Sequence, residues 1–212
     1  SKMINEVEAD IIDLVVPTFL HVPFAIKAAE AGKNIICEKP LTGYFGDPDI
    51  PIDDRTNVGT TDKRIMLQEC LKECERLKNA IDKSGVSFCY AENWIYAPPV
   101  VKLKNLIRVS QGTILDIRAE ESHSGSHAAY SRRWKTSGGG ALLRLGAHPV
   151  SAVLHRKHCE GMLKKGQGIR LKSVTAEVGR HTSIESFKKE SPKWIVSSWE
   201  DVEDWATMIM NF

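Results

Sequence analysis

A strand, helix and strand pattern near the start of the chain is the feature that most constrains its fold. Residues 11–16 read Ile-Ile-Asp-Leu-Val-Val and end at Pro17, as expected for a parallel strand that is covered on both faces. The alanine-rich stretch 21–31 predicts a helix that ends at Gly32. A second short apolar run at 34–37 predicts the next strand. The first part of the chain is therefore predicted to be α/β, with a parallel sheet built from a βαβ unit.

The following hundred residues extend this α/β pattern. Residues 41–61 are polar and rich in Gly and Pro, which indicates a surface excursion, and residues 86–90 predict another strand. Residues 62–83 carry apolar side chains at helical spacing and end before Gly85, so they predict an amphipathic helix. Its apolar stripe consists of Leu67, Cys70, Leu71, Cys74, Leu77 and Ile81. The two cysteines of this stripe are interpreted as small core side chains.

The second half of the chain has a different period. A helix is expected to open at Pro98, and apolar and polar residues then alternate over 115–120, 174–178 and 204–212. Such alternation is typical of strands with one wet face, so we expect an α+β domain with a mostly antiparallel open sheet. The boundary is placed at residue 97, giving domains 1–97 and 98–212. The exposed face of the second sheet predicts a homo-oligomer.

Composition excludes several classes of protein. The 212 residues are 42% hydrophobic and 26% charged, which is typical of a globular chain, and no apolar run is long enough for a membrane span. The first residues lack the layout of a signal peptide, so a cytoplasmic protein without a membrane partner is expected. The net charge is +2, and the basic excess of the second half is scattered, which disfavours a nucleic-acid partner. Five cysteines without a Cys-x-x-Cys pair disfavour a disulfide framework or a zinc site.

Two polar motifs follow the first two predicted strands. Pro17-Thr18 comes after the first strand, and Glu38-Lys39-Pro40 comes after the second. The carboxyl ends of parallel strands meet at one edge of a sheet, where ligands bind, so both motifs are expected to face one crevice.

The two motifs together resemble the glucose-fructose oxidoreductase and inositol dehydrogenase family (Gfo/Idh/MocA). The resemblance continues through Ala91–Pro98, through His123–Trp134 and through Gly138–Pro149, so it spans nearly the whole chain. It implies a partial Rossmann-type sheet and an enzyme that uses NAD or NADP to oxidise or reduce a sugar, cyclitol or related polyol. The first domain would then be the remainder of a dinucleotide-binding domain, and the second a truncated substrate and oligomerisation domain.

The resemblance also implies roles for individual residues. Lys39 and His148 match the family's catalytic lysine and histidine, and a cis Lys39-Pro40 bond is predicted. The cofactor-side positions are Pro17, Thr18, His21, Glu38, Lys39, Pro40 and Asn93. The stretch that contains His123, His127 and Trp134 is expected to line the substrate pocket.

The chemistry of alcohol oxidation independently requires a proton acceptor such as histidine or lysine. Removing a hydride from a secondary alcohol leaves a hydroxyl proton, and the group that accepts it works best with a pKa near the operating pH. Histidine, with an ordinary pKa of about 6.5, starts there. A lysine starts at about 10.4, so burial and a cationic nicotinamide would have to lower its pKa.

Arg144 is a departure from the family pattern, since many members carry an aspartate four residues before the histidine. With His148 at i+4, both side chains are expected on one helical face. An arginine cannot balance the charge of an imidazolium, but it can bind an anionic group of a substrate through two hydrogen bonds. The substrate, which the resemblance implies is a small molecule, is therefore proposed to be anionic.

Two further motifs admit more than one interpretation. His123 and His127 flank a Ser-Gly-Ser turn without a suitably spaced third ligand, so no metal is predicted there. The glycines 138–140 precede a helix and admit a phosphate cradle, but close approach of the backbone to substrate is preferred.

The family's glycine-rich turn, which binds phosphate, is not found before Ile11. Ser1 is expected to lie inside the fold, and the chain stops at Phe212 in a predicted strand. The sequence is therefore interpreted as a fragment that lacks the N-terminal glycine-rich part and the C-terminal end, and that is expected to bind cofactor weakly by itself. Two alternatives stay open: a non-catalytic sugar- or nucleotide-sensing relative, and an NAD-dependent glycosidase.

Overall fold

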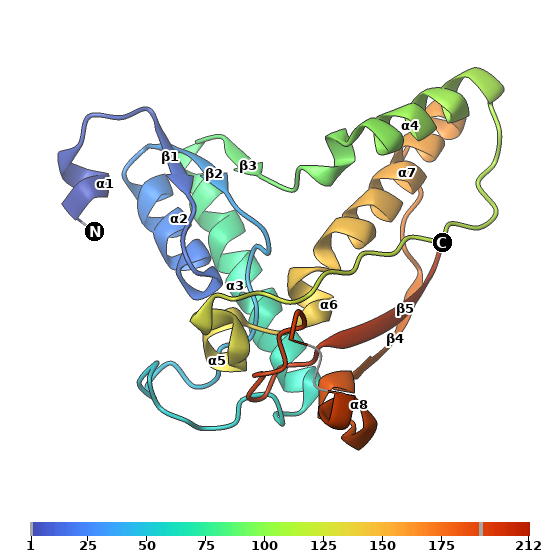
Figure 1. Cartoon of the computed structure of the whole chain (residues 1–212). Coiled ribbons are helices and arrows are strands. Elements are labelled where there is room, and N and C mark those ends of the chain that lie inside the picture. The colour runs from blue at the N-terminus through green and yellow to red at the C-terminus, as the bar shows by residue number, and fades with distance from the viewer. Residues whose placement is uncertain (1, 191–192) are drawn as a thin grey trace.

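The computed structural model describes residues 2–190 and 193–212 (Figure 1). The expectation that Ser1 lies inside the fold falls outside these residues. The first part of the chain contains α1 (Lys2–Glu6), β1 (Ile11–Leu14), η1 (Thr18–Leu20), α2 (His21–Glu30), β2 (Asn34–Cys37), α3 (Lys63–Ser84) and β3 (Phe88–Tyr90). Residues 41–61 form no helix or strand, as predicted.

The first sheet has the order β1-β2-β3, and both pairs of neighbours are parallel. Ile12 lies opposite Ile35, and Ile35 lies opposite Phe88. The predicted βαβ unit is therefore confirmed. Helix α2 begins at His21 and ends before Gly32, whose φ of 69° is the left-handed conformation that glycine adopts readily.

The expectation that the first strand is covered on both faces is wrong. Alternate residues of β1 are buried and exposed, so Ile12 and Leu14 point into the core while Ile11 is 53% exposed. Helices α2 and α3 pack against each other, and they cover one face of the sheet (Figure 1). The period-two pattern of burial follows from that one-sided packing.

An apolar core lies between this sheet face and the two helices. It is formed by Ile12, Leu14, Val22, Ala25, Ala28, Ala29, Ile35, Cys37 and Leu77. The alanines of α2 allow its backbone to approach the sheet closely. On α3 the predicted stripe is partly wrong: Leu77 is buried, but Leu67 and Leu71 are exposed and Met66 is buried instead. Cys70, Cys74 and Ile81 of the predicted stripe are half-buried, so the error is confined to Leu67 and Leu71 in the first turns of the helix.

The second part of the chain contains helices and a two-stranded sheet. Its elements are η2 (Trp94–Tyr96), α4 (Pro98–Ser110), η3 (Ala129–Arg132), α5 (Trp134–Ser137), α6 (Ala141–Arg144), α7 (Ala147–Lys165), β4 (Ser173–Gly179), η4 (His181–Ser183), α8 (Glu185–Glu190) and β5 (Trp205–Asn211). Strands β4 and β5 are antiparallel and pair from Ser173 opposite Asn211 to Gly179 opposite Trp205. The predicted fold class, a parallel α/β sheet followed by an antiparallel sheet, is confirmed. The boundary at residue 97 stays a prediction.

The strand predicted at 115–120 is wrong, because these residues form no ladder within the described part of the chain. Leu115 is 93% exposed. The backbone N–H of Ile114 donates instead to the carboxylate of Glu160 on α7, at 3.2 Å. Alternating side chains alone do not make a strand, which also needs a neighbour to accept its hydrogen bonds.

Helix α7 buries charged side chains where it packs near α4. Arg156 is buried and donates to the carbonyl oxygen of Val100 at 2.9 Å. Lys157 and Glu160 are also buried, and their side chains form an ion pair of 2.7 Å. Buried charges are tolerated when they are paired in this way.

Backbone contacts join the two parts of the chain. Gly43, which follows β2 in the chain, lies so close to Gly138 that a Cβ on Gly43 would fall 2.6 Å from the Gly138 Cα. Gly138 ends α5 with a φ of 77°. Nearby, the buried carboxylate of Glu203 accepts the N–H groups of Gly140 and Leu142 at 2.9 and 3.1 Å. The glycine run therefore serves close packing of the chain on itself.

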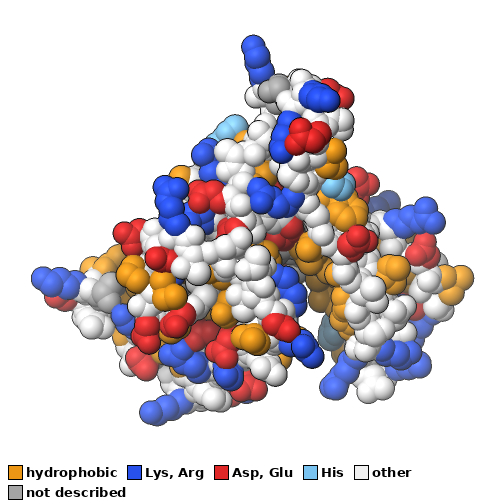
Figure 2. Space-filling model, turned by 90° about the horizontal axis from the view of Figure 1, so that it is seen from below, with side chains coloured by type: hydrophobic (Ala, Val, Ile, Leu, Met, Phe, Trp, Pro, Cys, Tyr) orange, Lys and Arg blue, Asp and Glu red, His pale blue; other side chains and the backbone are white. Residues whose placement is uncertain are grey.

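The surface carries charges of both signs. Lys and Arg side chains are interspersed with Asp and Glu over the face shown in Figure 2. In residues 2–190 and 193–212, no helix is both long and apolar enough to cross a membrane.

Candidate active site

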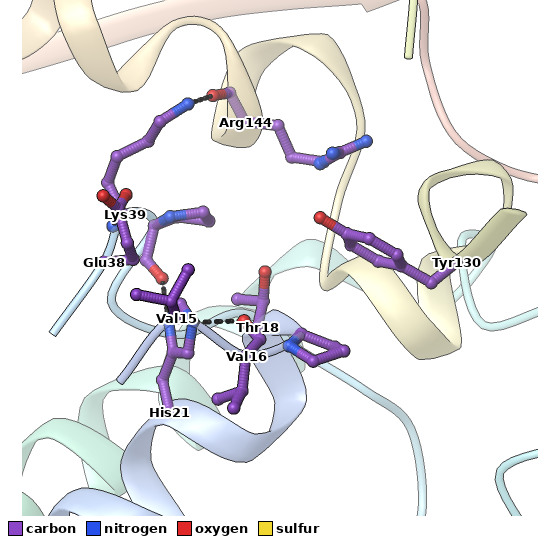
Figure 3. A pocket seen from close by; sticks show the side chains of 10 residues that line it. Val15, Val16, Thr18, His21, Glu38, Lys39, Tyr130 and Arg144 are labelled. Atoms are coloured by element: carbon purple, nitrogen blue, oxygen red, sulfur yellow. Dashed lines mark hydrogen bonds between the residues drawn. The ribbon is translucent and has the colours of Figure 1, made fainter. Parts of the chain in front are cut away.

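A cavity of about 370 Å³ lies at the carboxyl ends of β1 and β2, where the two strand-end motifs meet (Figure 3). Its lining residues are Val15, Val16, Pro17, Thr18, His21, Glu38, Lys39, Pro40, Tyr130 and Arg144. The first eight come from the ends of the parallel strands and the start of α2, while Tyr130 and Arg144 come from the second part of the chain. The cavity therefore lies between the two parts.

Lys39 crosses from the first part to the second. Its Nζ donates to the backbone carbonyl oxygen of Arg144 at 2.9 Å (Figure 3). Partial burial lowers the pKa of the Lys39 ammonium, and the nearby Arg144 guanidinium lowers it further. The carboxylates of Glu121, Glu38 and Glu92 act in the opposite direction without cancelling the shift. The bond between Lys39 and Pro40 is cis, as predicted.

His21 holds the two strand ends together. Its ring is buried, with Nδ1 2.8 Å from the carbonyl oxygen of Pro40 and Nε2 2.8 Å from that of Val16 (Figure 3). Both nitrogens are thus engaged by the backbone. In this structure His21 positions the turn at Pro40 from the first turn of α2, and it lines the cavity only as part of the wall.

Arg144 turns its guanidinium away from Lys39, toward Tyr130 (Figure 3). The guanidinium carbon lies 5.2 Å from the centre of the Tyr130 ring, within the range of a cation–π contact. The expectation that Arg144 and His148 share one helical face is wrong, because α6 ends at Arg144 and α7 begins at Ala147. The two side chains consequently have different partners.

His148 is buried near the start of α7 and pairs with a carboxylate. Its side chain is 8% exposed, and its Nδ1 lies 2.5 Å from Oε1 of Glu92, which is 4% exposed. The Trp94 ring packs beside the imidazole, with ring centres 5.5 Å apart. His148 does not line the cavity of Lys39. The two are linked through the Arg144 carbonyl, which lies four residues before His148 in the chain.

Glu92 was not among the predicted site residues. It is the second residue after β3, as Lys39 is the second residue after β2, and the two strands are parallel and adjacent. The strand-end argument that selected Glu38 and Lys39 could therefore also have selected Glu92. Tyr130 was missed as well, and no sequence signal marks its approach to Arg144.

Besides His148, four of the predicted site residues lie apart from the cavity of Lys39. Asn93 and His127 are exposed. His123 is exposed too, and it lines a second cavity of about 1130 Å³ between residues 114–123 and β5. Trp134 packs under the Lys63 ammonium, 4.3 Å from its ring centre, and its backbone N–H donates to Asp201 at 2.6 Å. Their assigned roles in binding stay predictions.

The lining of the first cavity fits part of a dinucleotide. Its volume is within the usual range of ligand pockets, about 300–1,000 Å³. The Glu38 carboxylate and the Thr18 hydroxyl are suited to ribose hydroxyls, and the cations of Lys39 and Arg144 are suited to anionic or carbonyl groups. Its location beyond the carboxyl ends of parallel strands is the usual ligand position in α/β proteins of this class.

Comparison with known proteins agrees with an α/β protein that binds a dinucleotide. Residues 1–47 match the GFO_IDH_MocA family, described as an oxidoreductase family with an NAD-binding Rossmann fold. The resemblance to the Gfo/Idh/MocA family is thereby confirmed over these residues. The matched residues include both strand-end motifs, the cis peptide and the first wall of the cavity.

Relatives and solved structures extend the similarity along the chain. An uncharacterized oxidoreductase, ORF334 of Rhizobium meliloti, is 26% identical over 148 residues, which are 70% of this chain and 36% of that protein. The scyllo-inositol 2-dehydrogenase (NADP(+)) IolW of Bacillus subtilis strain 168 is 24% identical over 158 residues, which are 73% of this chain and 36% of IolW. The chain thus spans little more than a third of the length of these relatives.

A crystal structure of GenD2 from gentamicin A biosynthesis, in complex with NAD, has a similar fold. The TM-score is 0.64 at 23% identity, and the match covers all of this chain and 47% of GenD2. The parallel sheet and the separate antiparallel sheet therefore belong to one known architecture.

Proposed function

We propose that this chain is part of an oxidoreductase that uses NAD or NADP to oxidise or reduce a sugar, cyclitol or related polyol. The observation that carries the proposal is the position of Lys39. Its amine lies at the carboxyl edge of a parallel sheet, beside a cavity, and is bonded to the segment that leads into the helix of His148. The family match at residues 1–47 and the inositol dehydrogenase relative support the same activity.

Within this proposal Pro17, Thr18 and Glu38–Pro40 would hold the cofactor, whose nicotinamide would supply the hydride chemistry. The residues of this chain manage the proton. Lys39 is suited to exchange a proton with a substrate hydroxyl because burial and Arg144 lower the pKa of its ammonium toward the operating range. His148 is the second proton-transfer group, and Glu92 holds its Nδ1 side.

Arg144 supports a finer proposal, that the substrate carries an anionic group. Its guanidinium lines the cavity and has no carboxylate partner within the part of the chain that the structure describes. The Tyr130 ring supports the guanidinium from one side and leaves its N–H groups free to bind a carboxylate or phosphate.

Lys39→Ala tests the proposed function. In the protein that contains this chain, sugars and polyols are screened with NAD and NADP for a change in nicotinamide absorbance. Removing Lys39 is expected to lower kcat about 10²- to 10⁴-fold, the usual contribution of a proton-transfer group. The control is Lys83→Ala, at the exposed end of α3, which is expected to leave kcat unchanged. Equal activity of the two variants would contradict the proposal.

A non-catalytic sugar- or nucleotide-sensing protein is the second candidate, favoured by the presence of Arg144 where the resemblance gives an aspartate. A sensor would show a rise in Tm with a sugar or nucleotide and no change in nicotinamide absorbance. Turnover of any sugar or polyol would exclude it.

A further inference from the structure

The position that the resemblance gives to an aspartate cannot orient His148 in this chain. It is occupied by Arg144, which donates rather than accepts hydrogen bonds and whose guanidinium packs over Tyr130. The break between α6 and α7 separates its side chain further from the imidazole. If His148 has an orienting carboxylate, it must come from elsewhere in the fold.

Glu92 supplies a carboxylate at the right place. Its Oε1 lies 2.5 Å from Nδ1 of His148 and also accepts the backbone N–H of Trp94 at 3.2 Å. Its Oε2 is buried and has no partner among the described residues. A carboxylate that is 4% exposed is costly to keep unless a partner compensates it, so the pairing with His148 matters to both side chains.

We propose that Glu92 is the positioning residue for His148 and takes the role that the resemblance gives to an aspartate at position 144. This inference rests on the proposed function, because it assigns the partner of the proposed proton-transfer group. Since a carboxylate only accepts hydrogen bonds, the imidazole must donate its Nδ1–H to Glu92. The lone pair of the neutral ring is then on Nε2, which has no hydrogen bond to any described residue.

The origin of Glu92 distinguishes this pair from a pair within one helix. Glu92 follows β3 of the parallel sheet, whereas His148 is on α7 of the second part. Lys39, which also follows a parallel strand, bonds to the segment before α7. Two strand ends therefore contact the same segment, and the Glu92 carboxylate acts electrostatically on Lys39 as well, since it opposes the lowering of the Lys39 pKa. The carboxylate thus connects both proposed proton-transfer groups.

The imidazole nitrogens report the pairing directly, by ¹⁵N NMR of the protein that contains this chain, without cofactor or substrate. At a pH where the ring is neutral, the unmodified chain is expected to show His148 with its proton on Nδ1. Glu92→Leu removes the acceptor, so the Nε2–H form is expected to increase. Glu92→Gln keeps an amide oxygen that accepts Nδ1–H and is expected to retain the original form. A proton on Nε2 in the unmodified chain would overturn the proposal even if Glu92→Leu failed to fold.

Glu121→Leu is the matched control. Glu121 is another carboxylate that acts on Lys39, and one of its oxygens is also buried without a partner among the described residues, but it makes no hydrogen bond with His148. Its removal is expected to leave the His148 nitrogens unchanged. The same change in both Leu variants would overturn a specific role for Glu92.

A kinetic measurement separates this inference from the proposed function. In the protein that contains this chain, Glu92→Leu is expected to lower kcat about 10-fold or more with little change in KM, and Glu92→Gln is expected to restore part of it. Loss of the Nδ1–H form without any fall in kcat would overturn the positioning role. If the unmodified protein has no turnover but Glu92→Leu shifts the proton to Nε2, the proposed function fails and the pairing of Glu92 with His148 stands.

Discussion

The two parts of the molecule bury different kinds of side chain. Under the parallel sheet the buried residues are aliphatic or small, as at Leu14 and Ile35. Along α7 of the second part, Arg156, Lys157 and Glu160 are buried instead. An apolar core is stabilised by close packing of any side chains that fill its volume. A buried charge is stabilised only when a counter-ion or hydrogen-bond partner lies next to it. The candidate active site lies between the two parts and uses charges from both.

Leu14→Ala should have the largest effect on stability. It deletes a side chain from the centre of the apolar core and is expected to lower the free energy of unfolding by about 2–5 kcal/mol. Urea denaturation followed by circular dichroism measures the change. Val15→Ala, at the next residue, is the control, because Val15 is 72% exposed and its loss should change stability by less than about 0.5 kcal/mol. Similar losses in both variants would show that the sheet face is not packed as described.

Glu160→Gln tests the charged side chains that are buried along α7. It leaves Lys157 buried without its counter-ion, and the expected loss is about 1–3 kcal/mol. The double variant Lys157→Met/Glu160→Leu should recover most of this loss, because it removes both charges. Glu185→Gln breaks an exposed ion pair with Lys188 and should cost at most about 1 kcal/mol. A double variant less stable than Glu160→Gln alone would contradict the comparison.

The same pair predicts a sensitivity to acid. Burial raises the pKa of Glu160, but the hydrogen bonds from Lys157 and Ile114 and the charges of Lys157 and Lys164 together outweigh it, so the pKa is below its ordinary value of 4.5. The stability contributed by Glu160 is therefore present at neutral pH and is lost as the pH falls through that lowered pKa. Glu160→Gln should flatten the loss of stability below about pH 4.5.

Arg144→Gln should have the smallest effect on stability and should act on the pH dependence of activity. Burial and the Arg144 guanidinium lower the pKa of Lys39, against the carboxylates of Glu121, Glu38 and Glu92. Removing the guanidinium raises that pKa, so the rising limb of kcat/KM should move to higher pH. Arg108→Gln, at the exposed end of α4, should leave the limb in place. An unmoved limb in Arg144→Gln would remove Lys39 from the proton transfer.

Local sequence patterns predicted the first part of the fold well. The run at 34–37, the glycine after α2 and the period of α3 each depend on near neighbours in the chain, and the structure has these elements at the predicted places. The same holds for the meeting of the two strand ends, since parallel strands bring Pro17 and Lys39 to one edge whatever follows them. The antiparallel pair β4 and β5 was also visible as alternation.

The rest depends on contacts between distant residues, which periodicity does not contain. Residues 115–120 alternate like a strand, but their neighbour at Ile114 bonds to a side chain of α7. Spacing places Arg144 and His148 one turn apart, but it does not show the break at Gly146 that separates them. Glu92 and His148 are 56 residues apart, and only the three-dimensional fold shows that they pair.

The contact between Gly43 and Gly138 has a consequence for the geometry of the candidate active site. Gly43 is four residues after Lys39, and Gly138 is six residues before Arg144. Short segments of chain therefore connect the Lys39 amine and the Arg144 carbonyl to one main-chain contact. A methyl group at either glycine would force the two segments of chain apart. Two residues without side chains thus set the distance between the Lys39 amine and the Arg144 carbonyl oxygen.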